Sequence, residues 1–190
     1  MTPLKNPAPA VNLPNILTLS RILVSPLLVI FLIRGMYGHA LLIFALAGVS
    51  DGLDGLLARW LDQGTLIGAY LDPIADKILI MSAFISLAVL GIAPPWVAVI
   101  IISRDILIVI GMVVLSFNHI RVEIRPSLVS KFNTCAQITL VIAILIDRVF
   151  SDSLGMLPWL CWVTAGLTIL SGLHYIYKGM NIFQDAHERG

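Results

Sequence analysis

The chain has 190 residues, of which 58% are hydrophobic and only 12% are charged, and its mean hydropathy is +0.96. A soluble domain of this length needs charged side chains over its whole surface, so this composition excludes an ordinary soluble domain and predicts an all-α integral membrane protein. The formal net charge of +1 gives no argument for a nucleic-acid partner, and we expect none.

Apolar runs of membrane-spanning length follow one another along the whole chain. A helix needs about 20 mostly apolar residues to cross the hydrocarbon core of a bilayer. On this rule the sequence predicts six transmembrane helices in a single domain, 1–190, after a cytoplasmic or interfacial segment, 1–14. The expected spans are, in chain order, Asn15 to Ile33, His39 to Trp60, Gly68 to Leu90, Pro95 to Phe117, Leu128 to Ile146 and Leu157 to Tyr177.

Basic residues gather on one side of this topology. With six spans both termini lie on the same side, and that side would carry Lys5, Arg59, Arg121, Arg125, Lys131, Lys178 and Arg189. The opposite loops offer only Arg34 and Arg148. The positive-inside rule therefore predicts a multi-pass protein of the cell inner (cytoplasmic) membrane, with both termini in the cytoplasm.

The second and third runs carry an aspartate cluster, in the stretch DGLDGLLARWLDQGTLIGAYLDPIAD. Asp51 and Asp54 are three residues apart, and Asp72 and Asp76 are four apart, so on a helix each pair shares a face. The turn at Gly64 would make the two helices antiparallel neighbours. We therefore expect the four carboxylates to converge in the cytoplasmic half of helices 2 and 3.

Four carboxylates in a region of low dielectric constant repel one another, and they would bind protons unless cations balanced their charge. A divalent metal ion, or a pair, is the natural counter-charge. Hard oxygen ligands suit Mg²⁺, Mn²⁺ or Ca²⁺. Two such ions can clamp the oxygens of a displacement at phosphorus, which indicates a substrate that carries phosphate.

Two alternatives compete with this interpretation. Gly52, Gly55 and Gly68 could serve close helix packing instead of making room for a base or a phosphate, and both uses can hold at once. The aspartates could also line the path of an intramembrane cation transporter. Arg59, Gly55 and Gly68 stand at fixed offsets from the aspartates, and in a transporter they would have no role.

The order D-x2-D-G-x2-A-R-x8-G-x3-D-x3-D resembles the signature of the CDP-alcohol phosphatidyltransferases. It is filled without a gap by Asp51, Asp54, Gly55, Ala58, Arg59, Gly68, Asp72 and Asp76. Six spans with the motif across the second and third also resemble that family, so the likeness covers nearly the whole chain. The resemblance implies transfer of a phosphatidyl group from CDP-diacylglycerol to an alcohol hydroxyl, with release of CMP.

The resemblance also implies roles for individual residues. A pair of Mg²⁺ or Mn²⁺ ions would be held by Asp51, Asp54, Asp72 and Asp76. Asp76 would also be the general base. The nucleotide would be bound by Asp51, Gly55, Ala58, Arg59 and Gly68, together with Thr18 of the first helix. Asp62 lies outside the motif and is expected in a loop, and the family resemblance suggests a homodimer among membrane lipids.

Cationic residues outside the motif bear on the acceptor alcohol. We expect a basic pocket for an acceptor phosphate, formed by Arg21, Arg104, Arg125 and Lys131. Each residue also has a structural interpretation. Arg104 could form a buried ion pair with Asp105, Arg125 and Lys131 could be positive-inside charges, and Arg21 could anchor the first helix at the interface.

Three segments bear on the branch of the family. NLPNILTLSRI resembles the first-helix entry of the phosphatidylglycerophosphate synthases and of the cardiolipin synthases of eukaryotic type. The former usually show A-R-E with a second Arg about two turns on, whereas this chain has SRDILI without that Arg. SRDILI, LVSKFNTCAQ and the closing LCWVTAGLTILSGLHYIYKG resemble the cardiolipin synthases more closely. The resemblance favours phosphatidylglycerol as acceptor, with glycerol 3-phosphate as the alternative.

Overall fold

The computed structural model describes residues 13–61, 66–117, 128–150 and 155–188, with side chains described over 20–50, 75, 77–111, 129–150, 155–181 and 184. The described residues form helices and no strand, as the sequence predicts. The helices are α1 (Leu13–Ile33), α2 (Tyr37–Leu61), α3 (Leu66–Val89), α4 (Pro95–Phe117), α5 (Leu128–Phe150) and α6 (Leu157–Glu188).

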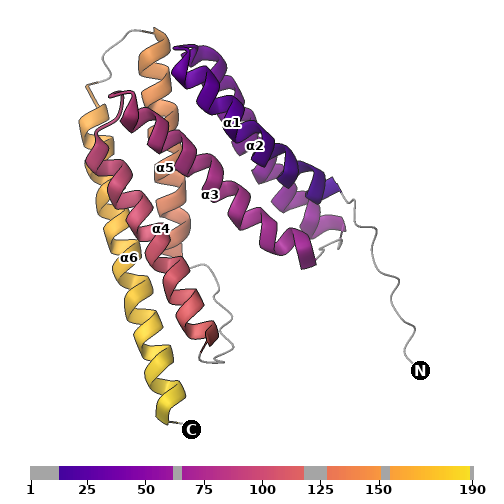
Figure 1. Cartoon of the computed structure of the whole chain (residues 1–190), viewed down its shortest axis with the longest axis vertical. Helices are drawn as coiled ribbons and strands as arrows, with labels where there is room; N and C mark the ends of the chain where they lie inside the picture. Colours follow the sequence, from indigo (N-terminus) through magenta and orange to yellow (C-terminus); the bar gives the residue numbers. More distant parts are fainter. Residues whose placement is uncertain (1–12, 62–65, 118–127, 151–154, 189–190) are drawn as a thin grey trace.

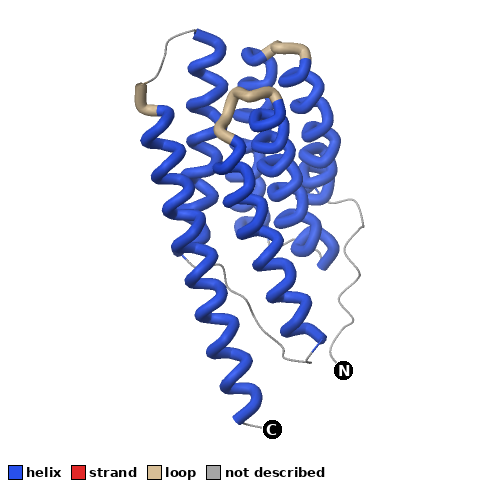
Figure 2. Tube along the Cα trace, turned by 60° about the vertical axis from the view of Figure 1, so that its left-hand side comes forward, coloured by secondary structure: helices blue, strands red, loops and turns tan. Residues whose placement is uncertain are grey.

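The helices run alternately up and down, with α5 and α6 along the long axis of the molecule and α1, α2 and α3 inclined to it (Figure 1). The described turns, at 34–36, 90–94 and 155–156, all lie at one end (Figure 2). α5 and α6 continue beyond their predicted ends, and α6 reaches Glu188 instead of Tyr177. Hydropathy marks only the apolar part of a helix, whereas good helix formers such as Gln, Ala and Glu extend it in polar surroundings.

Two of these turns depend on glycine. Gly35 and Gly91 have φ angles of 69° and 67°, which L-residues with a Cβ rarely adopt. The amide of Met36 donates to the carbonyl of Phe31 at 2.9 Å, and that of Ile92 donates to the carbonyl of Leu87, also at 2.9 Å. These are Schellman caps, which satisfy the last carbonyls of α1 and α3 and reverse the chain within a few residues.

The helices pack as two groups. α1 packs against both α2 and α3, while α6 packs against α4 and α5. The groups meet where α2 and α3 contact α5 and where α3 contacts α4. Fully buried apolar side chains fill the interior, the largest being Phe44, Phe84, Leu28, Leu32, Leu87, Ile101, Leu140 and Leu145.

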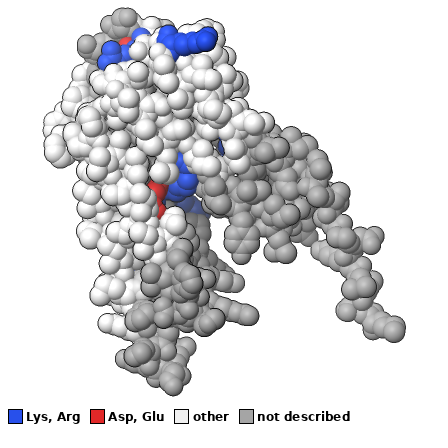
Figure 3. Space-filling model, viewed as in Figure 1, with Lys and Arg blue, Asp and Glu red and all other residues white. Residues whose placement is uncertain are grey.

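The surface of the described helices is more apolar than that of a soluble protein. Large apolar side chains such as Leu23, Val89 and Trp159 are 66%, 81% and 75% exposed, and much of the surface in Figure 3 carries no charge. Polar side chains are buried between α5 and α6, where the Thr168 hydroxyl lies 2.7 Å from Oδ1 of Asn133. Polar contacts between helices inside an apolar exterior are typical of membrane proteins.

Within the described residues, two stretches are long and apolar enough to cross a membrane, Val129–Phe150 and Leu157–Asn181. Shorter apolar helical stretches are Ser20–Ile33, Tyr37–Ser50 and Lys77–Val89. The helical architecture is therefore established. The crossing of the bilayer by all six helices stays a prediction.

Candidate functional site

The aspartate motif lies where α2 ends and α3 begins, at the end of the α1, α2 and α3 group that lies away from the described turns (Figure 1). Both of its halves are helical: 51–61 belongs to α2 and 66–76 to α3. On this backbone the spacings of three and four residues keep each aspartate pair on one face. α1 packs against both helices and holds them together.

The side chains of the motif lie outside those that the structure describes. The metal and nucleotide assignments therefore stay predictions for Asp51, Asp54, Gly55, Ala58, Arg59, Gly68, Asp72 and Asp76. The same holds for Thr18 of α1, and Arg125 and Asp62 fall between the described ranges. The structure does describe the residues that flank the motif, Ser50 before it and Lys77 directly after it.

Lys77 takes part in a buried ionic contact. Its ammonium group donates to Oδ1 of Asp105 on α4. The same oxygen accepts a hydrogen bond of 2.8 Å from Nη1 of Arg104. The side chains of Arg104 and Asp105 are only 5% and 4% exposed, whereas that of Lys77 is 39% exposed. One carboxylate thus ties the residue that follows Asp76 to α4.

The Arg104 guanidinium extends this contact to the remaining helices. Its Nη2 donates to Ser130 of α5 at 3.0 Å and to Ser171 of α6 at 2.5 Å. Its Cζ lies 5.3 Å from the centre of the Tyr175 ring, within range of a cation–π interaction. A Cβ at Gly172 would lie 3.5 Å from Cγ of Arg104, an ordinary van der Waals contact, so the backbone of α6 passes close to the arginine side chain.

These contacts bear on the two interpretations of Arg104, which are a buried ion pair with Asp105 and a place in the acceptor site. The buried ion pair between Arg104 and Asp105 is present. Both terminal nitrogens of Arg104 are already bonded to protein groups, which favours a role in holding helices together. The contacts with Lys77, Ser130 and Ser171 were not predicted from the sequence. Lys77 could have been noticed, because it is a charged residue that directly follows the motif.

The other two described candidates for the acceptor site lie in different surroundings. Lys131, next to Ser130, is exposed. Arg21 is 3% exposed and lines a pocket between α1 and α2. On the face shown in Figure 3 one group of charged side chains lies midway along the molecule, in a hollow, and another lies at the end with the described turns.

The comparisons with known proteins agree with the motif. The sequence model of the CDP-alcohol phosphatidyltransferase family matches residues 11–170. This match includes the whole motif and most of the six helices. The chain belongs to the CDP-alcohol phosphatidyltransferase family.

Cardiolipin synthases and phosphatidylglycerophosphate synthases are both among its relatives. The chain is 33% identical over 192 residues to a cardiolipin synthase (CMP-forming) of Rattus norvegicus, covering 91% of this chain and 63% of the rat protein. It is 30% identical over 185 residues to the CDP-diacylglycerol–glycerol-3-phosphate 3-phosphatidyltransferase of Bacillus subtilis, covering 88% of this chain and 94% of that protein. A probable phosphatidylglycerophosphate synthase of Mycobacterium tuberculosis is 43% identical over 122 residues, 61% of this chain and 56% of its own length. The chain thus spans less than two thirds of the rat cardiolipin synthase.

Replacement of Asp105 tests the buried ionic contact. Asp105→Ala leaves the Arg104 guanidinium buried without its carboxylate, and we expect the free energy of unfolding in detergent micelles to fall by about 3–5 kcal/mol. Ser103→Ala is the control, because Ser103 is exposed and its hydroxyl bonds only to the carbonyl of Ile100 within its own helix. Equal stability of the two variants would contradict the assignment.

Proposed function

We propose that this protein is a membrane-embedded phosphatidyltransferase. It moves the phosphatidyl group of CDP-diacylglycerol to the hydroxyl of a phosphate-bearing alcohol or lipid and releases CMP. The observation that carries the proposal is the complete motif from Asp51 to Asp76, which lies inside the family match on two consecutive helices that both pack against α1. A cation transporter would not need this motif.

The donor set of the motif fits divalent metal ions. Asp51, Asp54 and Asp72, with Asp76 as ligand or neighbour, offer only hard carboxylate oxygens, which suit Mg²⁺ or Mn²⁺. A bound pair of ions would neutralise the pyrophosphate and stabilise the negative charge that develops around the reacting phosphorus. Gly55, Ala58 and Gly68 keep side chains small where the cytidine nucleotide would bind, and Arg59 and Thr18 would contact it.

Asp76 acts in the chemical step as general base. It accepts the proton of the acceptor hydroxyl as the hydroxyl oxygen forms a bond to the β-phosphorus. The bond between that phosphorus and the bridging oxygen breaks, and CMP leaves with the electron pair. Asp76 then loses its proton to water, so the carboxylate is restored for the next turnover.

Phosphatidylglycerol is the acceptor that we propose first. Arg104 is occupied by Asp105, Ser130 and Ser171, and the apolar run after it has no second Arg to hold a small phosphate. Lys131 follows Ser130 in the chain and is exposed, so it is a candidate to meet an acceptor phosphate, with Arg125 as a further candidate. Glycerol 3-phosphate is the second candidate, supported by the Bacillus subtilis relative, most of whose length this chain covers.

The membrane setting belongs to the same proposal. The exposed leucines, valines and tryptophans of the described helices suit acyl chains. The six helices would cross the cytoplasmic membrane with the motif on the cytoplasmic side, as the positive-inside rule predicts. A homodimer would bury part of the same apolar surface.

The reaction is tested with purified protein in detergent. CDP-diacylglycerol is supplied with Mg²⁺ or Mn²⁺ and with phosphatidylglycerol, glycerol 3-phosphate, inositol phosphate or serine, and CMP release is followed together with the lipid product. We expect metal-dependent CMP release and cardiolipin as product. Phosphatidylglycerophosphate as the main product would reverse the choice of acceptor, and no release with any acceptor would refute the enzyme.

Replacement of single aspartates separates the base from the metal ligands. We expect Asp76→Asn to abolish turnover while it largely spares CDP-diacylglycerol binding, because an amide cannot accept the proton. Asp51→Asn and Asp72→Asn should weaken metal and nucleotide binding together. Asp62→Asn, outside the motif, is the matched control and should leave both unchanged. Normal turnover by Asp76→Asn would show that another group is the base.

Lys131 is tested through the acceptor. Lys131→Gln removes a charge-assisted hydrogen bond to the acceptor phosphate, and we expect the KM for the acceptor to rise about tenfold. The KM for CDP-diacylglycerol should stay the same, and Lys131→Arg should recover most of the loss. Lys178→Gln on α6 is the control. An equal rise of both KM values in Lys131→Gln would remove Lys131 from the acceptor site.

A further inference from the structure

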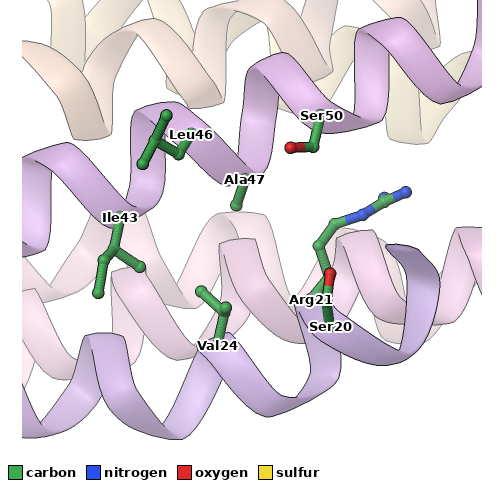
Figure 4. A pocket seen from close by; sticks show the side chains of 7 residues that line it. All are labelled: Ser20, Arg21, Val24, Ile43, Leu46, Ala47 and Ser50. Carbon is green, nitrogen blue, oxygen red and sulfur yellow. The ribbon is translucent and has the colours of Figure 1, made fainter. Parts of the chain in front are cut away.

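A pocket of about 150 Å³ lies between α1 and α2. One end of it is polar: Figure 4 shows the hydroxyl of Ser50 and the guanidinium of Arg21 at the same end, with Ser20 beneath the arginine. Ser50 directly precedes Asp51, the first residue of the motif. The polar end of the pocket is therefore the end nearest to the motif.

The other end of the pocket is apolar. It is formed by Val24 of α1 and by Ile43, Leu46 and Ala47 of α2. From Ser50 to Ile43 the helix rises by roughly 10 Å, at about 1.5 Å per residue. Leu46 is 57% exposed, so this wall borders the lipid-facing surface. The pocket thus runs from the motif towards the middle of the bundle and changes from polar to apolar on the way.

The change from a polar to an apolar lining indicates the chemistry of the ligand that fits the pocket. Arg21 and Ser50 can donate hydrogen bonds to ester carbonyl oxygens, which only accept. The apolar walls suit methylene groups and exclude ordered water, which needs several polar partners. A cavity of about 150 Å³ is also the size that holds one benzene molecule in a protein core, so there is room for one chain segment.

We propose that this pocket binds one glycerol ester and the first methylenes of one acyl chain of the CDP-diacylglycerol donor. The inference rests on the proposed function. In a donor whose pyrophosphate lies at the motif, the glycerol ester follows the phosphate and the acyl chain points away from it. The lining of the pocket has the same order, polar near the motif and apolar farther away. Arg21 then acts on the donor lipid, and not on the acceptor with which the sequence grouped it.

The pocket is tested by filling it. Ala47 faces the pocket in Figure 4, and Ala47→Leu puts an isobutyl group where the chain would lie. Gly48→Leu is the matched control, because a Cβ at Gly48 meets nothing within 4 Å. Each protein is assayed for kcat/KM with dioleoyl CDP-diacylglycerol and with diacetyl CDP-diacylglycerol, whose acyl groups have no methylenes, and the ratio of the two values is compared.

We expect Ala47→Leu to lower this ratio about tenfold relative to the parent protein, since several methylenes lose their burial, and Gly48→Leu to leave it unchanged. Leu46→Trp narrows the pocket from its exposed side and should lower the ratio too, which keeps the test open if Ala47→Leu does not fold. An unchanged ratio in both pocket variants would overturn the inference.

Two further outcomes identify the source of a failure. If the parent protein releases no CMP from either donor, the proposed function fails before the pocket is tested. If the pocket variants raise the KM for phosphatidylglycerol and leave the donor ratio unchanged, the pocket belongs to the acceptor lipid and the assignment to the donor is wrong.

Discussion

The arrangement of the described helices depends on one buried carboxylate. Asp105 accepts hydrogen bonds from Lys77 of α3 and from Arg104 of α4, and Arg104 in turn donates to α5 and α6 through Ser130 and Ser171. Charges buried in this way are stable only when each has its partners. Four helices are therefore held in one relative position, and α3, which carries half of the aspartate motif, is fixed one residue beyond Asp76.

The other half of the motif is held by different means. α2 reaches α3 mainly through a shared neighbour, because α1 packs against both, and the contact is made by apolar side chains such as Leu28, Leu32 and Phe44. The half of the motif on α3 is thus followed directly by an ionic contact, and the half on α2 borders the pocket between α1 and α2.

Much of this architecture could be predicted from the sequence. Runs of apolar residues gave the position of each helix, and α4 was predicted with its observed bounds, because Pro95 starts it and hydropathy falls after Phe117. The spacing of the aspartates gave the motif and the family. The ion pair of Arg104 with Asp105 was among the interpretations offered by the sequence. The serine partners of Arg104 could not be predicted, because they are 26 and 67 residues away in the chain and serine carries no periodic signal. The pocket is a product of how α1 and α2 pack, which no local pattern records.

The contacts of α6 show that the folding unit extends beyond the end of the family match. The family match stops at residue 170, yet Ser171 and Tyr175, which hold the Arg104 guanidinium, follow directly after it. A boundary drawn at the end of the family match would cut α6 through the turn that completes the ionic contact. The segment that the family model matches and the segment that the ionic contact needs therefore differ, and the second extends at least one further helical turn.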